Sequence, residues 1–542
     1  MSGLVLHAHR PLVRRLALFV GAVVLVAACG SSTRVDAGPS RGAMPDPPAP
    51  TPSSPVALSL LHVAGGAHPA FVDAQGRQVL LRGVNLNSLG DYYQARPDRP
   101  SVVPVTDADW GSMASLGLSV VRLIVSWSFL EPTRGHFDTA YLAKVKAAVA
   151  EAKRHGLYVV LDMHQDAWGK YIATPAGTHC PAGTEPNAGW DGAPKWATIT
   201  DGASTCRHPG NRESAPAVQA AFTNFYANRD GIQDEFVRTW RWLATAFAKE
   251  TAVAGYDLLN EPNVVGVPTV TIVRYTALLA HLVTAIRQGE AAGRGPRHIV
   301  FFEPLVLFPL PNTMPPRGFT TDHDIAFAPH NYWESITNGI FTIEQGFDLD
   351  ASAVKGWGVP SWIGEYGWWD TSKATVAKLH RNAAAEDKAF GGSTWWQWRQ
   401  ACGDPHGLST PSATPPTEVV QLNTISCPGD HQQRLTAPFA PLVSRAYARS
   451  APGRLTSLVS DYDHRRMRLT GSSRGAARGA RLQVWVPQSA HHGPPVVGGA
   501  GLSAVRVVAV PGGWIVSAQV ACSYSLTIDI DQVVTGPIGG CR

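Results

Sequence analysis

Two glutamates, Glu261 and Glu365, each follow a short apolar run, in Leu258-Leu259-Asn260-Glu261-Pro262 and in Ile363-Gly364-Glu365-Tyr366-Gly367. Two carboxyl groups facing each other across one site are what the hydrolysis of a glycosidic bond requires. In a retaining enzyme one carboxylate is the nucleophile, and the other carboxyl group, about 5–5.5 Å away, donates a proton to the leaving group. The pKa values of the two must differ, because the donor has to be protonated near neutral pH.

Other polar and aromatic side chains also stand at the ends of apolar runs. Asn260 suits a contact with a sugar 2-hydroxyl that strengthens in the transition state, and Arg122 and Tyr332 suit holding a carboxylate ionised and aimed. Trp396 offers an aromatic face on which a sugar ring can stack. A lone carboxylate at a strand end is more often a helix cap or a surface ion pair, and Glu303 is a rival for either catalytic glutamate. The full set, in its order along the chain, favours catalysis: Arg122, His164, Asn260, Glu261, His330, Tyr332, Glu365 and Trp396.

From about residue 70, short apolar runs alternate with segments whose apolar residues recur every three or four positions, such as Tyr141–His155 and Gln233–Glu250. This alternation predicts parallel β/α units, and hence an α/β fold of the (β/α)8 barrel type, with functional groups at the carboxyl ends of the strands. An open doubly wound sheet is the alternative, but no G-x-G-x-x-G follows the first strand and no phosphate-binding loop is found. The eight predicted strands are Val79–Asn85, Val120–Ser126, Leu157–Met163, Ala254–Asn260, His298–Glu303, Ile325–His330, Ser361–Glu365 and Ser393–Trp398.

The end of the chain changes character. Apolar and polar residues alternate with a period of two in 482–486 and 524–530, between breaks rich in Gly and Pro. This pattern predicts a C-terminal antiparallel β-sandwich domain. We therefore expect a catalytic barrel over residues 58–450 and a sandwich over residues 451–542.

The first 57 residues carry the marks of export. Three arginines between residues 10 and 15 precede an apolar run, Leu16–Ala28, that is too short to span a membrane. The run ends in Val26-Ala27-Ala28-Cys29, which resembles a bacterial lipobox and implies a signal peptide over residues 1–29 with lipid attached to Cys29. An ordinary secretion signal with an incidental cysteine is the alternative. Residues 30–57 are rich in Pro and predict a disordered tether, so we expect an exported bacterial protein, either secreted or held at the cell envelope.

Export makes the other six cysteines candidates for disulfides. Proximity in sequence suggests Cys180–Cys206, Cys402–Cys427 and Cys522–Cys541, although six cysteines allow about 15 pairings. No spacing typical of a zinc site is present, so we expect neither a metal nor another cofactor.

Composition excludes several classes of protein. Of the 542 residues, 44% are hydrophobic and 16% are charged, which excludes a wholly disordered chain and a coiled coil. The net charge of +5 comes from the two ends: residues 1–50 hold five Arg against two Asp, and residues 452–542 hold nine Arg against four Asp. A nucleic-acid-binding surface is therefore disfavoured in the central region.

With these motifs, the sequence over about residues 70–445 resembles the retaining glycoside hydrolases of family 5, a (β/α)8 group. The resemblance implies that Glu261 is the acid/base and Glu365 the nucleophile, and that the other residues of the set above bind substrate. Within the family the sequence looks like the endoglycoceramidase branch, through Asp162-Met163-His164-Gln165-Asp166 and an insertion that contains Gly192–Ala197 and Ala221–Tyr226. This branch cleaves between an oligosaccharide and ceramide, and the resemblance implies that Asp162 and Trp196 bind the sugar.

The sequence departs from that branch in two ways. Asn87–Tyr92 has no lysine where some members contact sugar with one, and the insertion holds Cys180 and Cys206. These departures leave the choice of sugar open, so glucosyl- or galactosylceramide is as plausible a substrate as a ganglioside.

The expected partners are a glycosphingolipid, or another β-linked glycan, and a membrane surface reached through the lipid anchor; no nucleic acid is expected. The sequence does not fix the oligomeric state, and a monomer is the expectation. A family 5 polysaccharidase of the cellulase or mannanase type is an alternative, as is a non-catalytic binding lipoprotein. The apolar stretch 304–311, with Trp333, Trp368 and Trp369, predicts a lipid slot, unless these residues only pack long loops against one another.

Overall fold

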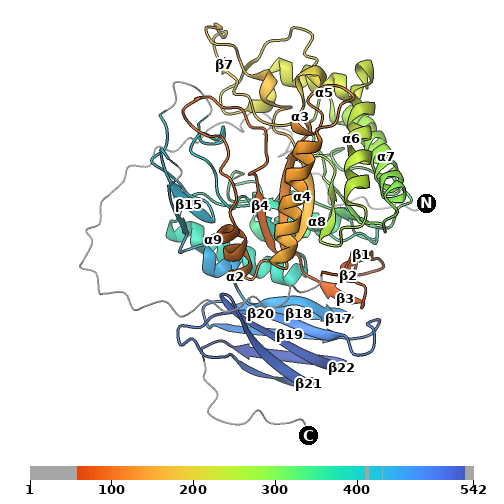
Figure 1. Cartoon of the computed structure of the whole chain (residues 1–542), viewed down its shortest axis with the longest axis vertical. Coiled ribbons are helices and arrows are strands. Elements are labelled where there is room, and N and C mark those ends of the chain that lie inside the picture. The colour runs from red at the N-terminus through yellow and green to blue at the C-terminus, as the bar shows by residue number, and fades with distance from the viewer. Residues whose placement is uncertain (1–57, 338, 409–413, 430, 532–542) are drawn as a thin grey trace, which may run out of the picture.

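The computed structural model describes residues 58–337, 339–408, 414–429 and 431–531. The predicted signal peptide, the lipidation site Cys29 and the tether lie outside the described residues, and so does Cys541. Figure 1 shows two parts, a barrel with its surrounding helices and a broad antiparallel sheet packed beneath it.

The barrel is a ring of eight parallel strands in the order β11-β10-β9-β6-β5-β4-β13-β12. Two isolated bridges, Phe327 with Ser361 and His330 with Glu365, join β11 to β12 and close the ring. The predicted (β/α)8 fold is therefore confirmed. The strands are β4 (Gly83–Leu86), β5 (Val120–Ser126), β6 (Tyr158–His164), β9 (Val253–Asp257), β10 (Ile299–Phe302), β11 (Ile325–Phe327), β12 (Ile363–Tyr366) and β13 (Ser393–Trp395).

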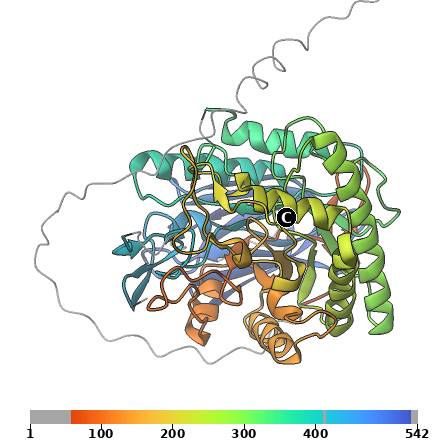
Figure 2. The same ribbon diagram turned by 90° about the horizontal axis from the view of Figure 1, so that it is seen from above.

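Helices lie around the outside of these strands (Figure 2). The residues of α4 show why they form: Leu142, Val145 and Val149 are buried on one side, and Asp138 accepts hydrogen bonds from the first free backbone N–H groups. Helix α7 is long and apolar enough to cross a membrane by length and composition, but half of its apolar window is buried and it packs along α6. The helices are α2 (Asp107–Ser115), α3 (Trp127–Leu130), α4 (Thr139–Arg154), α5 (Pro216–Tyr226), α6 (Ile232–Phe247), α7 (Pro268–Ala292), α8 (Ile343–Ala353), α9 (Lys373–Ala389) and α10 (Ala440–Val443).

The second part is a nine-stranded antiparallel sheet in the order β1-β2-β3-β17-β20-β22-β19-β18, with β21 paired to β22. The predicted boundary at residues 450/451 falls inside β17, and β1–β3, which the sequence placed with the barrel, pair with the C-terminal strands instead. The strands are β1 (Leu61–Ala64), β2 (Ala70–Asp73), β3 (Arg77–Val79), β17 (Tyr447–Pro452), β18 (Arg454–Asp461), β19 (Arg466–Ser472), β20 (Arg481–Pro487), β21 (Val496–Val510) and β22 (Gly513–Asp529).

This sheet covers the amino-terminal end of the barrel strands. The hydroxyl of Tyr447 donates to the carbonyl of Gly117, which lies in the turn before β5, and Arg449 donates to the carbonyl of Gly156, which precedes β6. Gly117 has φ +74°, and a Cβ atom there would lie 2.2 Å from the ring of Trp485, so only glycine lets the two parts approach this closely. The opposite end of the barrel stays available for a site.

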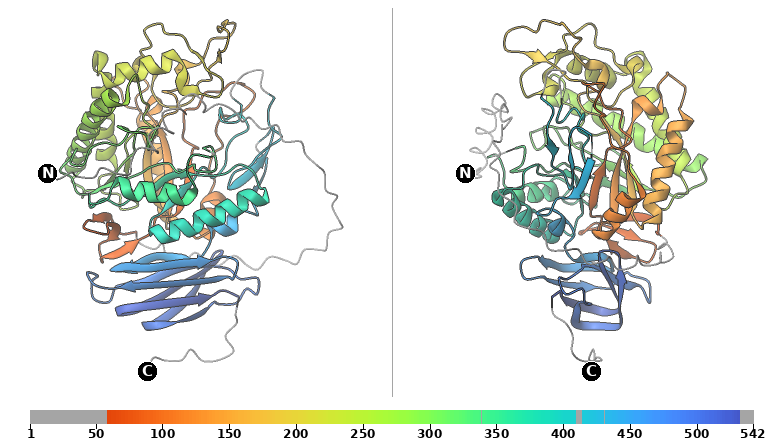
Figure 3. Two further views of the ribbon diagram at one scale, coloured as in Figure 1. Left: turned by 180° about the vertical axis from the view of Figure 1, so that it is seen from behind. Right: turned by 60° about the vertical axis from the view of Figure 1, so that its left-hand side comes forward.

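A long insertion between β6 and α5 lies over that opposite, carboxyl end (Figures 1 and 3). It contains η1 (Lys170–Ile172), β7 (Glu185–Pro186), η2 (Lys195–Ala197), β8 (Cys206–Arg207) and η3 (Arg212–Ser214), and η4 (Arg229–Gly231) follows α5. The disulfide Cys180–Cys206 crosslinks it, as the sequence predicted.

A second disulfide, Cys402–Cys427, also as predicted, ties the loop after β13 to a small sheet of β14 (Glu418–Val419), β15 (Asn423–Ser426) and β16 (His431–Leu435). Cys522 is exposed. Its predicted partner, Cys541, lies outside the described residues, so this third pairing stays a prediction.

Candidate active site

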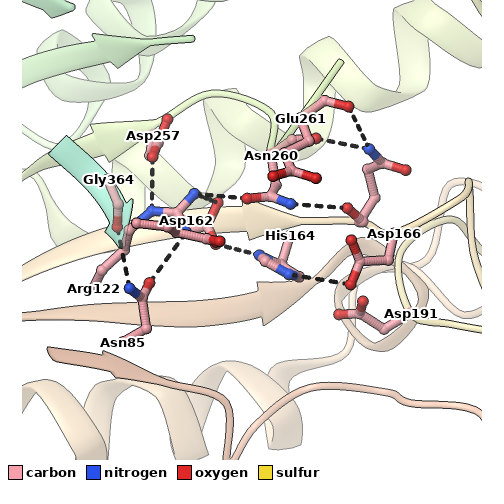
Figure 4. Close-up of polar contacts among 12 residues, drawn as sticks. Asn85, Arg122, Asp162, His164, Asp166, Asp191, Asp257, Asn260, Glu261 and Gly364 are labelled. Atoms are coloured by element: carbon pink, nitrogen blue, oxygen red, sulfur yellow. Dashed lines mark hydrogen bonds and ion pairs between the residues drawn. The ribbon is translucent and has the colours of Figure 1, made fainter. Parts of the chain in front are cut away.

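A single arginine, Arg122, organises the carboxyl end of the barrel. It lies in the middle of β5, its side chain is fully buried, and a buried guanidinium needs several acceptors around it. Its Nη1 lies 2.7 Å from Glu365 Oε1, and its Nε lies 2.9 Å from Asp257 Oδ2. The guanidinium also contacts Asp162, Asn85 and Asn260 (Figure 4). A further contact is with Glu303.

Glu365 lies in β12 and is almost completely buried. Beyond the contact with Arg122, its Oε2 accepts a hydrogen bond from the hydroxyl of Tyr332 at 2.8 Å, and His330 Nδ1 lies 3.4 Å away. Burial raises the pKa of Glu365 above its ordinary value, although the charges of His330 and Arg122 oppose this effect. The contacts fix both oxygens of the carboxyl group, which is what a nucleophile needs.

Glu261 follows β9 and has a φ of 41°, in the left-handed region that a non-glycine residue rarely adopts. Its backbone N–H donates to Glu303 Oε2 at 2.8 Å, which holds this conformation. Such a conformation costs about 1–3 kcal/mol and is typical of functional sites. The side chain is one-fifth exposed, so it is open to a ligand.

The two glutamates face each other. One carboxylate oxygen of each and one ring nitrogen of His330 all lie within 4.8 Å of one another. His330 Nδ1 lies 2.9 Å from Glu261 Oε1, so His330 contacts both carboxyl groups. The spacing of the two carboxyl groups is close to the about 5–5.5 Å of a retaining site and too short for the wider gap of an inverting one.

The pKa of Glu261 is affected by opposite influences. Burial acts to raise it, but the hydrogen bond and charge of His330 and the charge of Arg212 lower it below the ordinary value. The pKa of His330 itself is raised well above its usual range, because Glu303 and Glu365 outweigh its burial. His330 and Arg212 therefore favour the carboxylate form of Glu261 in the absence of substrate.

Beside the glutamates lies a cluster suited to binding sugar hydroxyls. His164 Nδ1 lies 2.7 Å from Asp162 Oδ2, and the ring of His164 stacks on Trp396 at 5.2 Å between ring centres. Burial raises the pKa of Asp191 to about 7, while the charge of Arg212 overcomes burial and holds the pKa of Asp166 well below its ordinary value. Among the described residues, Asp191 Oδ1, Tyr92 Oη and Trp190 Nε1 have no hydrogen-bond partner, although all three are buried.

Most of the residues predicted from the sequence meet at this site: Arg122, Asp162, His164, Asn260, Glu261, His330, Tyr332, Glu365 and Trp396. Trp196 does not join them. Its indole donates to the backbone of Glu131 and its ring packs on Trp127, so its predicted sugar contact stays a prediction. Trp190 of the same insertion lies at the site instead, against Arg212 and His406.

Sequence reasoning missed several members of the network. Asn85 and Asp257 lie at the ends of strands and contact Arg122; a charged residue in a fully buried strand is a signal that a partner is needed. Asp191, Arg212 and His406 come from loops without any periodicity, so the sequence held no local signal for them. The oxygens of Asp162, Asp257 and Glu303 lie within 4.8 Å of one another, and the guanidinium of Arg122 contacts all three.

A closed (β/α)8 barrel with two facing carboxyl groups at the carboxyl ends of β9 and β12 defines a glycosidase. Residues 72–401 match the family model for cellulase (glycosyl hydrolase family 5), and the chain belongs to this family. The crystal structure of endogalactoceramidase is 39% identical in sequence and superposes with a TM-score of 0.79 over 87% of this chain and 100% of that chain. The chain is therefore an endoglycoceramidase-like member of family 5, as the sequence predicted.

Two curated relatives match shorter regions. Endoglycoceramidase I of Rhodococcus hoagii (strain 103S) is 29% identical over 290 residues, which are 50% of this chain and 52% of the relative. An endoglycoceramidase of Cyanea nozakii is 28% identical over 221 residues, which are 35% of this chain and 40% of the relative. The chain thus matches about half or less of the length of these relatives.

Proposed function

We propose that the protein is a retaining endo-β-glycosidase that hydrolyses the bond between the glycan and the ceramide of a glycosphingolipid. The observation that carries this proposal is the approach of Glu261 and Glu365, with an oxygen of each within 4.8 Å of the same nitrogen of His330. A carboxylate pair at this spacing supports attack by one carboxylate and protonation by the other on the same bond.

In the first step Glu365 attacks the anomeric carbon and forms a covalent glycosyl ester, while the bond to the ceramide oxygen breaks. Glu261 gives its proton to that oxygen, so ceramide leaves as a neutral alcohol. Arg122 and Tyr332 hold the two oxygens of Glu365 in place for the attack. The amide oxygen of Asn260 accepts from Arg122 and its amide nitrogen donates to the carbonyl of Gln165, so the second amide hydrogen is the one that can meet the sugar 2-hydroxyl.

In the second step Glu261, now a carboxylate, takes a proton from water, and the resulting hydroxide attacks the anomeric carbon. The ester bond to Glu365 breaks, and the glycan leaves with the same anomeric configuration as the substrate. The first step needs protonated Glu261 and the second step needs its carboxylate. The pKa of Glu261 therefore has to lie near the pH at which the enzyme works. The contacts with His330 and Arg212 lower the pKa of Glu261 and so favour the carboxylate that the second step needs.

The rim of the barrel supports a lipid substrate. Trp369 is 38% exposed and stacks on Tyr332, with 5.9 Å between ring centres, so an apolar face begins directly beside the nucleophile. Further exposed apolar side chains follow on the neighbouring rim loops and on the first turns of α7: Leu307, Ile336, Ile340, Val267, Val270 and Val273. Apolar residues gathered at one edge of a site are typical of a surface that binds lipid.

Only part of the predicted lipid slot is an exposed apolar surface. Leu305, Trp333 and Trp368 are buried in the core and pack the loops, as the alternative interpretation held, whereas Leu307 and Trp369 are exposed. We therefore assign the lipid-facing role to the exposed residues alone.

For the glycan, the similarity to endogalactoceramidase favours a galactose attached to ceramide, and a glucose remains the second candidate. A cavity of about 440 Å³, lined by Tyr92, Tyr93, Phe129 and Lys170 among others, lies beside the sugar-binding cluster. It adjoins the cluster because the ring of Tyr92 also contacts His406. We propose that this space takes up further sugars when the glycan is longer than one residue.

We also propose that the protein is exported and anchored through Cys29. The two disulfides within the described residues support an oxidising compartment. Labelling with a radioactive fatty acid, in wild type and in Cys29→Ala, tests the anchor: label on wild type alone supports it, and label on neither leaves a secreted enzyme.

The test of the function is incubation of the full chain with galactosyl-, glucosyl- and lactosylceramide in detergent and with cellulose and mannan. We expect release of ceramide and of a sugar whose β-anomer appears first by NMR. Release of soluble sugar from cellulose or mannan alone would make the protein a polysaccharidase, and the α-anomer appearing first would exclude retention.

The role of Glu261 is tested by Glu261→Ala. The rate on a ceramide glycoside should fall by about 10²–10⁴-fold, because the leaving alcohol needs a proton. A glycosyl fluoride, whose leaving group needs none, should lose far less in the first step. Equal losses on both substrates would contradict the role of Glu261 as the acid.

A further inference from the structure

One charged side chain reaches Glu261 from outside the barrel strands. Arg212 lies in η3 of the insertion, and its Nη2 contacts Asp166 Oδ1 at 2.5 Å and Glu261 Oε2 at 3.2 Å. Two carboxylates, one after β6 and one after β9, thus share one nitrogen of a residue that belongs to the insertion. The Arg212 side chain is 18% exposed, so this contact is shielded from most of the solvent.

The position of Arg212 is fixed from several sides. Its Nε lies 2.5 Å from Glu213 Oε1, and its guanidinium lies over the ring of Trp190 at 4.5 Å, within the range of a cation–π contact. Trp190 in turn packs on His406. The disulfide Cys180–Cys206 ends six positions before Arg212 and closes the insertion covalently. A long, flexible side chain is therefore held in one place, which is needed if it is to act on Glu261.

We propose that Arg212 is a positioning residue for the reaction: it holds Glu261 as a carboxylate in the empty site and so favours the base over the acid form of this group. The inference rests on the proposed function, in which Glu261 has both roles.

The charges around Glu261 make the direction of this effect clear. Arg212 from the insertion and His330 from the end of β11 are the cations that contact it. Asp166, which follows β6, Glu365 of β12 and Glu303, which accepts from its backbone N–H, are the facing anions. Without Arg212, His330 would be the one cation in contact with Glu261 among the described residues, and Glu261 would bind its proton more tightly. An opposite charge at this distance changes a pKa by about 1–3 units.

The charge of Arg212 has opposite effects on the two steps of the reaction. The first step needs a protonated Glu261, and Arg212 makes this form rarer. The second step needs the carboxylate, and Arg212 stabilises it while water is deprotonated. Arg212 therefore shifts the enzyme toward rapid release of the covalent intermediate at the expense of its formation.

This effect has a signature in the pH dependence of kcat/KM, which reports the first step. On the alkaline side the rate depends on how much Glu261 keeps its proton, and on the acidic side it depends on how much Glu365 has lost its own. This separation holds whichever of the two groups has the higher pKa. We call the two sides of this pH profile its alkaline arm and its acidic arm. A change in the pKa of Glu261 alone moves the alkaline arm relative to the acidic arm, whereas a general loss of active-site structure lowers kcat/KM on both arms together.

The test compares wild type with Arg212→Met and Arg212→Gln on octyl β-galactoside and octyl β-glucoside, whose poor leaving group needs the acid. Relative to the acidic arm, the alkaline arm should rise by about tenfold or more in both variants. Arg134→Met is the matched control, because Arg134 also lies over a tryptophan, Trp196, at 5.7 Å but does not contact Glu261. Arms that move in parallel, or an alkaline arm that falls, would overturn the proposal.

A second measurement does not depend on turnover. Carbon-13 NMR of the full chain labelled at the glutamate carboxyl carbons follows the protonation of Glu261, whose signal is assigned by its loss in Glu261→Gln. The midpoint for Glu261 should rise by about one pH unit or more in Arg212→Gln. An unchanged midpoint overturns the role of Arg212 even if the enzyme cleaves glycolipids. A raised midpoint in a protein that cleaves no glycoside supports it while the proposed function fails.

Discussion

Buried arginines and carboxylates occur at both ends of the barrel, but their charge balance differs. At the amino-terminal end, Arg82 and Arg445 face Glu386 and Asp387, two cations against two anions. Arg82 Nη2 lies 2.6 Å and Arg445 Nη2 3.0 Å from Asp387 Oδ1. This cluster joins α9 to the segment that enters the antiparallel sheet, and it has no charge left to offer a ligand.

At the carboxyl end a single guanidinium, that of Arg122, contacts four carboxyl groups, those of Asp162, Asp257, Glu303 and Glu365. Burial raises the pKa of Asp257 well above its usual range, and it also raises that of Glu365. Carboxyl groups that outnumber the guanidinium they surround are costly to bury, but carboxylates beside the sugar stabilise the positive charge that develops on it in the transition state. We call the amino-terminal end, with equal numbers of buried cations and anions, the balanced end, and the carboxyl end, where four carboxyl groups contact Arg122, the unbalanced end. The charges of the balanced end stabilise the fold, and those of the unbalanced end serve the reaction.

The largest expected effect is a loss of activity at the carboxyl end of the barrel. Glu365→Gln should lower kcat on any glycoside substrate by on the order of 10⁴-fold or more, because no covalent intermediate can form. The same change removes a buried, desolvated charge, so the melting temperature should equal or exceed that of wild type. Turnover and thermal unfolding of the purified variant check both statements; hydrolysis at the wild-type rate would remove Glu365 from the mechanism.

The next largest effect is a loss of stability without a loss of activity, at the amino-terminal end of the barrel. Arg445→Met breaks the balanced cluster and leaves Glu386 and Asp387 with Arg82 alone, which should lower the free energy of unfolding by about 3–5 kcal/mol. Well below its melting temperature the variant should keep the wild-type KM and kcat. Arg466→Met is the control, because Arg466 pairs with Asp529 on the surface and such a pair contributes about 1 kcal/mol or less. A loss of activity in folded Arg445→Met would mean that the two ends are coupled.

A third effect depends on pH. His406 Nδ1 lies 2.7 Å from Asp404 and its Nε2 3.2 Å from Asp166; burial acts to lower its pKa, but the charge of Asp404 and the contact with Asp166 raise it to about 10. A histidine with a raised pKa stabilises the fold fully below its unfolded value of about 6.5, and this contribution is lost as the pH rises toward 10. The stability difference between wild type and His406→Gln should therefore shrink between about pH 6.5 and 10. Urea unfolding at several pH values measures it, and a constant difference would contradict the assignment.

Much of the barrel could be predicted because buried parallel strands are continuous apolar runs. The predicted strand Val120–Ser126 coincides with β5, and the others overlap their observed counterparts. The errors have physical causes. The run predicted as Ala254–Asn260 is assigned to β9 only as far as Asp257. The backbone N–H groups of Leu258 and Asn260 still donate to Phe301 and Met163, and the left-handed conformation comes at Glu261. Strands β1–β3 were missed as part of the second sheet, because their hydrogen-bond partner β17 lies more than 350 residues later.

The residues of the candidate site also divide into those that the sequence could predict and those that it could not. Residues at the ends of strands, such as Glu261, Glu365 and His330, could be predicted, because the barrel brings all strand ends to one rim. Arg212 and His406 could not, because the path of a long loop depends on contacts that no local pattern records. The family motif gave the right loop, but it did not single out Trp190, the tryptophan of this loop that contacts Arg212. The sugar contact predicted for Trp196, whose indole donates to the backbone of Glu131, stays a prediction.

The smallest expected effect concerns the apolar edge of the unbalanced end. Trp369→Ala should raise the KM for a glycosylceramide by about 3- to 10-fold, the equivalent of about 1 kcal/mol of lost apolar contact. KM for a short soluble glycoside should stay unchanged, because the sugar-binding cluster is untouched. Val508→Ala, at an exposed apolar residue of β21 in the other part of the molecule, is the control. Equal effects of Trp369→Ala on both substrates would place Trp369 with the sugar through its stacking on Tyr332, and the lipid would then have to meet the protein along Leu307 and the first turns of α7 instead.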